Sequence, residues 1–386
     1  MNRNLVLFVL TFSQLACVSL WFLPNALLSG PLAVFPMSIS IQGVTTMVQV
    51  GFILGTLFFA MFSLADIYSP SKVFFTSALI ASACNLLFLV HVASPFWFYS
   101  IRLLTGFFLA GIYPVGMKIA ADYFEKEIGK ALGYLVGALV VGTAFPYLLA
   151  GQSFQLQWSQ VVWISSGLSL AGGLLILLFI PDGPFRKPGA GFHPEVILDI
   201  FKQRRFRETA FGYFGHMWEL YAFWAFIPFV IKFQMGLSME KANQMVFYVI
   251  GIGGIGCIVG GYMAKRFGNY KVALYALIGS GICCLVSPFI LHSYSIWLFP
   301  FLLVWGMLVV MDSPQFSSLI ARYAPGEDRG SALTLVTCIG FSITVISIIT
   351  LGMVIKMVGT TWLFWFLLPG PLLGVVFFAN PNKTNP

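Results

Sequence analysis

The sequence contains one pattern twice, with the second copy about 200 residues after the first. Several residues of the first copy have a counterpart 199 or 200 positions further along: Asp66 and Lys265, Lys72 and Lys271, Pro114 and Pro314, and Tyr123 and Tyr323. In both copies, long apolar stretches alternate with short basic turns. An internal repeat of this length in an apolar chain is typical of transporters built from two similar halves, with the binding site between them.

The composition requires a lipid environment. Of the 386 residues, 59% are hydrophobic and 9% are charged, whereas about 25% of the residues of a soluble domain are charged. A bilayer accommodates this apolar surface, because about 20 apolar residues form a helix that crosses it. Six cysteines lie within the apolar stretches and lack metal-ligand spacing, so we expect them to pack in the interior and we expect no metal site.

Twelve apolar stretches are long enough to cross the bilayer, six on each side of a polar segment. They cover residues 5–28, 41–65, 73–91, 96–121, 130–151, 160–180, 209–231, 243–264, 272–291, 295–320, 331–353 and 360–379. The first lacks a cleavage-site pattern, and we expect a retained helix. We predict an all-α membrane protein with twelve transmembrane helices in two pseudo-symmetric six-helix halves, at 1–180 and 208–386.

The polar segment at 181–207 is predicted to be a cytoplasmic linker. It opens with Pro181, Asp182, Gly183 and Pro184, which end the preceding helix. Between 193 and 207, apolar residues recur at helical spacing among basic ones. This pattern suits an amphipathic helix on the membrane surface.

The basic residues are distributed unequally between the two sides of the membrane. With both termini and the even-numbered loops in the cytoplasm, 17 of the 21 Lys and Arg residues are cytoplasmic, Arg102 lies within a span, and three are external: Lys232, Lys241 and Lys356. The net charge of +8 therefore reflects topology, and we expect no nucleic-acid partner. We predict a multi-pass protein of a bacterial inner membrane with both termini cytoplasmic.

Two turns carry a resemblance to a known family. Residues 62–72 are similar to the loop motif between helices 2 and 3 of the major facilitator superfamily: Asp66 and Lys72 match, while the expected glycines and arginine are missing. Residues 261–271 keep the glycines and basic residues of the motif, namely Lys265, Arg266 and Lys271, without the acid. The resemblance implies that the turn packs the cytoplasmic ends of the halves together in one conformation, with Asp66 beside a helix N-terminus or a basic residue.

Helices 4 and 5 also bear on the resemblance. Arg102 and Gly106 match the family's R-x-x-x-G element, in which glycine permits close helix approach and the arginine must find water or an acid. We expect Arg102 to hold a substrate anion or to form a salt bridge with an acid across the cavity, and favour the salt bridge. Helix 5 lacks the antiporter motif and has instead Gly133, Gly137, Gly142 and Pro146.

Four ionisable side chains fall deep within the predicted helices: Arg102, His216, Glu219 and Asp312. Each costs roughly 2.5 to 3.5 kcal/mol when it faces lipid, so all four are expected to face the protein interior. The resemblance implies the same, because helices 4, 7 and 10 line the central cavity in the family.

His216 and Glu219 are three residues apart and share one helix face. A low dielectric favours the protonated carboxyl group, and imidazole titrates near neutral pH, so the two residues are candidates for loading and releasing a proton. The alternative is a hydrogen-bonded contact between helices. Asp312 neighbours Ser313, Pro314 and Gln315, which indicates either a polar cavity site or a structural cap on a bent helix.

Aromatic side chains on the predicted cavity helices offer stacking surfaces for a planar or cationic solute. The candidates are Trp21, Tyr113, Trp218 and Tyr221, with Trp224 and Trp305 as further members. Packing roles are the alternative for each. His91 and His292 are expected at the outer ends of helices 3 and 9, as interface residues.

The leading functional hypothesis is a proton-coupled secondary transporter of a small organic solute, working by alternating access, with import preferred. The alternatives are an efflux antiporter for a metabolite, siderophore or drug, an intramembrane enzyme, and a transporter-like sensor. No nucleotide-binding P-loop or catalytic motif is present, so we expect no enzyme activity and no cofactor. The expected partners are the bilayer, protons and a small-molecule substrate, and the expected oligomeric state is a monomer.

Overall fold

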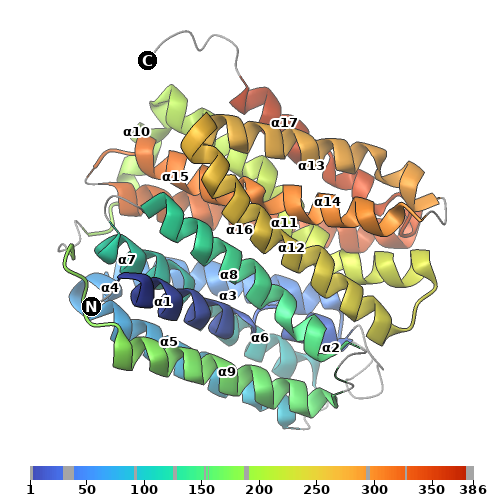
Figure 1. The fold of residues 1–386 in the computed structure, drawn as a ribbon, viewed down its shortest axis with the longest axis horizontal. Helices are drawn as coiled ribbons and strands as arrows, with labels where there is room; N and C mark the ends of the chain where they lie inside the picture. Colours follow the sequence, from blue (N-terminus) through green and yellow to red (C-terminus); the bar gives the residue numbers. More distant parts are fainter. Residues whose placement is uncertain are drawn as a thin grey trace.

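The structure is a computed structural model that describes residues 3–28, 39–90, 94–124, 128–151, 154, 156–186, 191–292, 296–326 and 328–379. Within these ranges the chain is helical and has no strand. The helices run side by side, with the first half of the chain in the lower part of Figure 1 and the second half in the upper part. The predicted all-α fold is confirmed.

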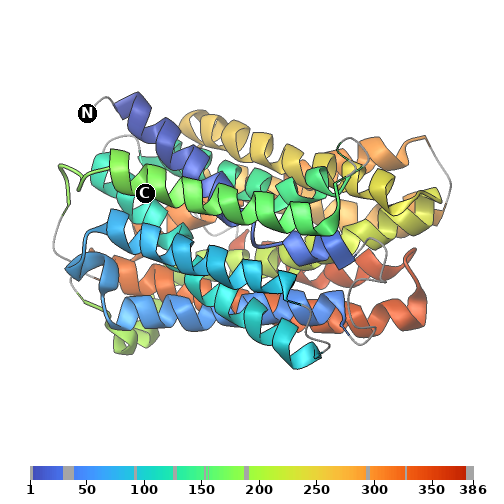
Figure 2. The same ribbon diagram turned by 90° about the horizontal axis from the view of Figure 1, so that it is seen from below.

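The first half consists of nine α-helices in the described ranges. These are α1 (Arg3–Val18), α2 (Leu23–Leu28), α3 (Ile41–Met61), α4 (Leu64–Ile67), α5 (Pro70–Leu86), α6 (Pro95–Leu109), α7 (Tyr113–Tyr123), α8 (Ile128–Leu149) and α9 (Trp158–Phe179). On the outer side of this half, α9 packs between α1 and α5, as Figure 2 shows.

The second half follows a short linker helix. The linker contains α10 (Ile197–Lys202), and the helices of the second half are α11 (Arg204–Met235), α12 (Met239–Phe267), α13 (Asn269–His292), α14 (Leu298–Met311), α15 (Ser313–Tyr323), α16 (Arg329–Val358) and α17 (Pro369–Phe378). The predicted surface helix at 193–207 is thus divided between α10 and the start of α11. Gln203 separates them, because its backbone is extended.

In the part of the chain that the structure describes, ten helical segments are long and apolar enough to cross a membrane, where α6 with α7 and α14 with α15 each count as one. The first and last predicted spans correspond to shorter apolar helices, Arg3–Val18 and Leu363–Phe378. A multi-pass membrane protein is therefore confirmed, and the count of twelve spans stays a prediction.

Four of the predicted spans are interrupted near a proline; in the twelfth, Leu368 separates the 3-10 turn Leu363–Leu367 from Pro369, the first residue of α17 (Pro369–Phe378). The first is broken between Val18 and Leu23, next to Pro24, so it is not one continuous helix from 5 to 28. The fourth and tenth are broken just before α7 and α15, whose second residues are Pro114 and Pro314. Proline fixes its own backbone and lacks the N–H that would continue the preceding helix.

The repeat recurs in the packing of each half. A Cβ atom added at Gly106 would overlap the carbonyl oxygen of Val48, and one added at Gly306 would overlap that of Val249. The two glycines are 200 positions apart, and each lets one helix pair of its half, α3 with α6 or α12 with α14, approach backbone to backbone.

In the described part of the chain, the most extensive contacts between the halves are those of α8 with α12 and of α3 with α16. In the first pair, a Cβ at Gly137 would lie 3.0 Å from the carbonyl oxygen of Gly254, and the reverse distance is the same. In the second, the rings of Phe52 and Phe341 lie 4.5 Å apart. One seam is therefore a close glycine crossing, and the other is filled by large side chains.

Candidate substrate and proton site

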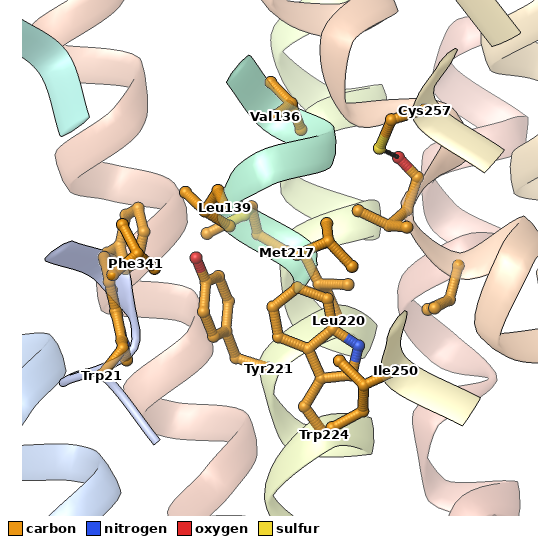
Figure 3. Packing of buried hydrophobic residues seen from close by; sticks show 14 of the residues in the cluster. Trp21, Val136, Leu139, Met217, Leu220, Tyr221, Trp224, Ile250, Cys257 and Phe341 are labelled. Atoms are coloured by element: carbon orange, nitrogen blue, oxygen red, sulfur yellow. Dashed lines mark hydrogen bonds between the residues drawn. The ribbon is translucent and has the colours of Figure 1, made fainter. Parts of the chain in front are cut away.

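The halves meet at an aromatic contact in their interior. The Trp21 ring lies 5.7 Å from the Tyr221 ring at 25° to its plane, and 5.8 Å from the ring of Phe341. Phe52 packs on Trp21 at 4.8 Å. Figure 3 shows Tyr221 between Trp21 and other buried side chains of α11. We call Trp21, Phe52, Tyr221 and Phe341 the aromatic contact; all four are almost fully buried.

Arg102 reaches the break in the first helix. Its Nη1 donates to the carbonyl oxygen of Leu20 at 3.1 Å, and its Nη2 donates to that of Trp21. The side chain is fully buried, and it makes no ion pair within the described ranges. The expected salt bridge across the cavity is therefore wrong, because the interrupted helix leaves carbonyl groups without intrahelical partners.

His216 lies between two groups at the break of the tenth span. Its Nδ1 is 2.9 Å from Oδ1 of Asp312, and its Nε2 is 2.9 Å from Oγ of Ser313. His216 and Asp312 are each 1% exposed. The structure thus brings His216 to Asp312, while the hydrogen-bond partners of Glu219 lie elsewhere.

Asp312 occupies the position just before α15, but its side chain makes no capping hydrogen bond to the helix. The carboxylate meets His216 instead, which disfavours the structural-cap interpretation. Gln315, predicted alongside it, is buried with its Nε2 3.3 Å from where a Cβ on Gly260 would lie. Gln315 therefore faces α12 of its own half.

Glu219 is buried within the second half, among α11, α13 and α14. Trp305 Nε1 donates to its Oε1 at 2.7 Å, and Cys284 Sγ donates to the same oxygen at 3.4 Å. Ser280 Oγ donates to Oε2 at 2.9 Å and also lies 3.2 Å from the carbonyl oxygen of Leu277. Every hydrogen-bond partner of this carboxyl group in the described ranges is neutral.

The arrangement of paired helix breaks, close glycine crossings and buried ionisable groups agrees with a sequence comparison. The family model of the Major Facilitator Superfamily matches residues 5–347. The chain belongs to the Major Facilitator Superfamily. Membership in a superfamily of transporters supports transport over the intramembrane-enzyme alternative.

Among solved structures, the crystal structure of the human organic anion transporter MFSD10 (TETRAN) is similar in fold to this superfamily member. The TM-score is 0.76 at 15% sequence identity, over 98% of this chain and 100% of that one. At this identity the similarity concerns the fold alone.

Relatives in the superfamily carry different names. A galacturonate transporter of Dickeya chrysanthemi is 25% identical over 42% of this chain, a PmrA-homologous multi-drug resistance efflux pump of Lactococcus lactis is 23% identical over 66%, and the agnestins efflux protein AgnL12 of Paecilomyces divaricatus is 22% identical over 72%. The matched regions span 52%, 64% and 64% of the relatives' lengths.

The turn around Asp66 makes its polar contacts with the first half and the linker. Asp66 forms an ion pair with Lys118 of α7. Arg186 of the linker donates to the carbonyl oxygens of Asp66 and Tyr68, at 3.0 and 2.8 Å, and pairs with Asp182. The contacts therefore join α4, α7 and the linker, and none of them reaches the second half.

The basic residues of the two turns differ from Asp66 in being exposed. These are Lys72, Lys265, Arg266 and Lys271. Within the described ranges none of them forms an ion pair. Lys265 lies 5.7 Å from the ring of Tyr262, and Arg266 lies 5.3 Å from that of Phe267.

The predicted aromatic residues divide into two groups. Trp21 and Tyr221 belong to the aromatic contact, and Tyr113 is the half-buried first residue of α7. Trp218 donates from Nε1 to the carbonyl oxygen of Phe366 at 3.3 Å, so it packs within the second half and away from the first. His91 lies outside the described residues, and His292 is the exposed last residue of α13.

Several functional partners were not singled out from the sequence. Ser280 and Cys284 contact Glu219, and Lys118 pairs with Asp66. All six cysteines are buried and free, as expected for packing residues, yet Cys284 also donates a hydrogen bond. The spacing of Ser280 and Cys284, one helical turn apart, is the signal that could have revealed a shared polar face.

Proposed function

We propose that this protein is a proton-coupled secondary active transporter of a small organic solute, in which residues 1–180 move against residues 208–386. Family membership supports alternating access as the mode of transport. The observation that carries the proton coupling is Glu219, a buried carboxyl group with three neutral donors.

The surroundings of Glu219 suit both of its protonation states. When ionised, it accepts from Trp305, Cys284 and Ser280. When protonated, it can donate from Oε2 to Ser280 Oγ, because the Ser280 hydroxyl then donates to the carbonyl oxygen of Leu277. A proton is gained or lost without leaving a polar atom unpaired, as a coupling carboxyl group requires.

His216 and Asp312 are the second proton candidates. They lie 2.9 Å apart at the break before α15, a helix end that a movement of the halves would disturb. We assign Asp312 to the solute site and His216 to proton transfer with Glu219, one helical turn away. The alternative is that the His216 and Asp312 pair carries the proton and Glu219 is structural.

Import is the preferred direction, because helix 5 lacks the antiporter motif and places Gly137 and Pro146 in α8 instead. Efflux of a metabolite, siderophore or drug is the alternative, and two of the relatives are named as efflux proteins.

The charge distribution supports cytoplasmic termini in a bacterial inner membrane. A monomer suffices for this mechanism.

The test uses purified protein in liposomes, supplied with a defined mixture of sugars, amino acids, nucleosides and organic acids. An inward pH difference of one unit supports about tenfold accumulation at one proton per solute, since one pH unit is about 1.36 kcal/mol. Glu219→Gln should reduce the accumulation ratio of the transported solute to about one, while exchange down a gradient persists. Mass spectrometry of the vesicle contents measures both.

Glu208→Gln is the matched control. Glu208 lies near the start of the same helix, paired with Arg204, and its substitution should leave accumulation unchanged. Accumulation by Glu219→Gln at the wild-type ratio would show that Glu219 is structural and would make Asp312 the next candidate. No uptake of any solute by wild-type protein would contradict transport of this solute class.

A further inference from the structure

We infer that the outer end of the transporter is closed by two matched contacts, each between a glutamine of one half and a glycine of the other. The outer end is the end with the predicted external loops, opposite the linker and the turn around Asp66. The contacts are Gln42 with Gly352 and Gln244 with Gly151, and we call them the two outer contacts. The inference rests on the proposed function and names the residues that control entry of the solute from outside.

The first outer contact joins α3 to α16. Gln42 is the second residue of α3, and Gly352 is a buried residue near the end of α16. A Cβ atom added at Gly352 would overlap the side-chain amide of Gln42. The amide therefore occupies the space that glycine leaves by having no side chain, and the two helices interlock at this level.

The second outer contact joins α8 to α12. Gly151 lies just beyond the end of α8, and Gln244 lies near the start of α12. A Cβ atom added at Gly151 would lie 3.3 Å from the Cβ atom of Gln244. The neighbouring Asn243 is buried, and its Nδ2 donates to the carbonyl oxygen of Ala26 at 3.1 Å. The start of α12 therefore packs against both α8 and α2 of the first half.

The two outer contacts are counterparts in the repeat. Gln244 stands 202 positions after Gln42, and Gly352 stands 201 positions after Gly151. Each contact thus joins the start of the second span of one half to the end of the fifth span of the other. The same arrangement occurs on both sides of the interface, which indicates that the pair holds the two halves together at this end.

The position of the outer contacts makes them the part of the interface that outward opening must break. Alternating access separates the halves at one end at a time. Gln42 and Gln244 are half-buried, so each side-chain amide can exchange its contact for water when the helices part. At the opposite end, the contacts of Asp66 stay within the first half and the linker.

The experiment measures how fast a membrane-impermeant thiol reagent labels a reporter cysteine on intact cells that express the full chain. The reporter is Gln49→Cys, because Gln49 is fully buried and lies two helical turns below Gln42 on the same face of α3. Mass spectrometry of the reporter peptide measures the labelling.

A disulfide across either outer contact should keep the outer end closed. The variants are Gln42→Cys with Gly352→Cys, and Gly151→Cys with Gln244→Cys, whose Cβ separation of 3.3 Å is close to that of a disulfide. Oxidation should slow labelling of the reporter at least about tenfold, because the open state is no longer populated, and prior reduction should restore it.

Removing an outer contact should have the opposite effect. Gln42→Ala should speed labelling about tenfold, the value of one or two neutral hydrogen bonds. Gly352→Ala should act in the same direction, because the methyl group displaces the amide of Gln42. Gln234→Ala is the matched control: this glutamine near the end of α11 lies 2.9 Å from the hydroxyl groups of Thr360 and Thr361, in its own half. Its labelling should match the wild type.

Equal labelling in the oxidised and reduced proteins, or no labelling of the reporter in any variant, would overturn the inference. Labelling of Gln42→Ala at the wild-type rate would also overturn it. Slower labelling after oxidation, combined with no solute uptake by wild-type protein in liposomes, would contradict the proposed transport and leave the outer contacts standing. Uptake that is lost on oxidation and restored by reduction would support both.

Discussion

The two halves share their packing scaffold but differ in their buried chemistry. Gly106 and Gly306 permit the same close helix crossing in each half. Three of the four deep ionisable residues, however, lie in the second half, and the only one in the first half, Arg102, is bonded to backbone. Two hundred positions from Arg102 stands Leu302, and two hundred before Asp312 stands Ile112.

The difference shows which constraints a repeated fold imposes. A glycine at a backbone crossing is required wherever the same two helices cross, so both copies retain it. A buried polar side chain is required only where it binds solute or exchanges a proton, so the two halves can carry different polar residues. The proposed division places proton exchange at Glu219 and the solute contact of Asp312 in the second half.

The largest expected loss of stability comes from substituting the glycines at the helix crossings that the two halves share. Gly106→Ala and Gly306→Ala should each cost about 3 kcal/mol or more, because the new methyl group overlaps a backbone carbonyl that cannot move alone. Yield and melting temperature in detergent measure this cost. Gly261→Ala, with no atom within 4 Å of the added group, should be neutral or stabilising. Equal tolerance of all three would contradict a shared crossing.

The next-largest effect is expected at Arg102, the buried charged residue of the first half. Arg102→Lys should lower stability by about 2 kcal/mol, because an ammonium group cannot match the planar fork that bonds two carbonyl groups. Thermal unfolding of purified protein measures the loss. If Arg102→Lys is as stable as the wild type while uptake fails, Arg102 acts on the solute instead.

A smaller effect is expected at the second half's pair. Asp312→Asn should weaken solute binding about tenfold and leave the accumulation ratio intact, because the residue is assigned to the site and not to the coupling. Initial uptake rates over a range of solute concentrations separate the two. A lost accumulation ratio with unchanged affinity would transfer the coupling role from Glu219 to Asp312.

The smallest effect concerns the cytoplasmic turn. Asp66→Asn should slow turnover severalfold with little loss of stability, since the pair with Lys118 is partly exposed and such pairs contribute about 0.2 to 1 kcal/mol. Lys118→Gln should reproduce it. Wild-type turnover in both variants would mean that the motif has no gating role in this chain.

Much of the scaffold was predictable from the sequence, because its signals are local. Apolar runs located the spans, and Pro314 indicated the break beside Asp312. The partners of the buried groups were not predictable. Whether Glu219 meets His216 or Trp305 depends on how α11 is rotated against α13 and α14, and no local pattern fixes that rotation. Arg102 was assigned an acid because the break at Leu20 and Trp21 was unseen.

The aromatic contact has a consequence for symmetry. Trp21 and Tyr221 are 200 positions apart, so they are counterparts in the repeat, and yet their rings lie 5.7 Å from each other. Counterparts that touch must lie on either side of the twofold axis that relates the halves. In a homodimer of one half, a single residue would contact its own copy there. Fusion into one chain gives each side its own codon, and this chain has tryptophan on one side of the axis and tyrosine on the other.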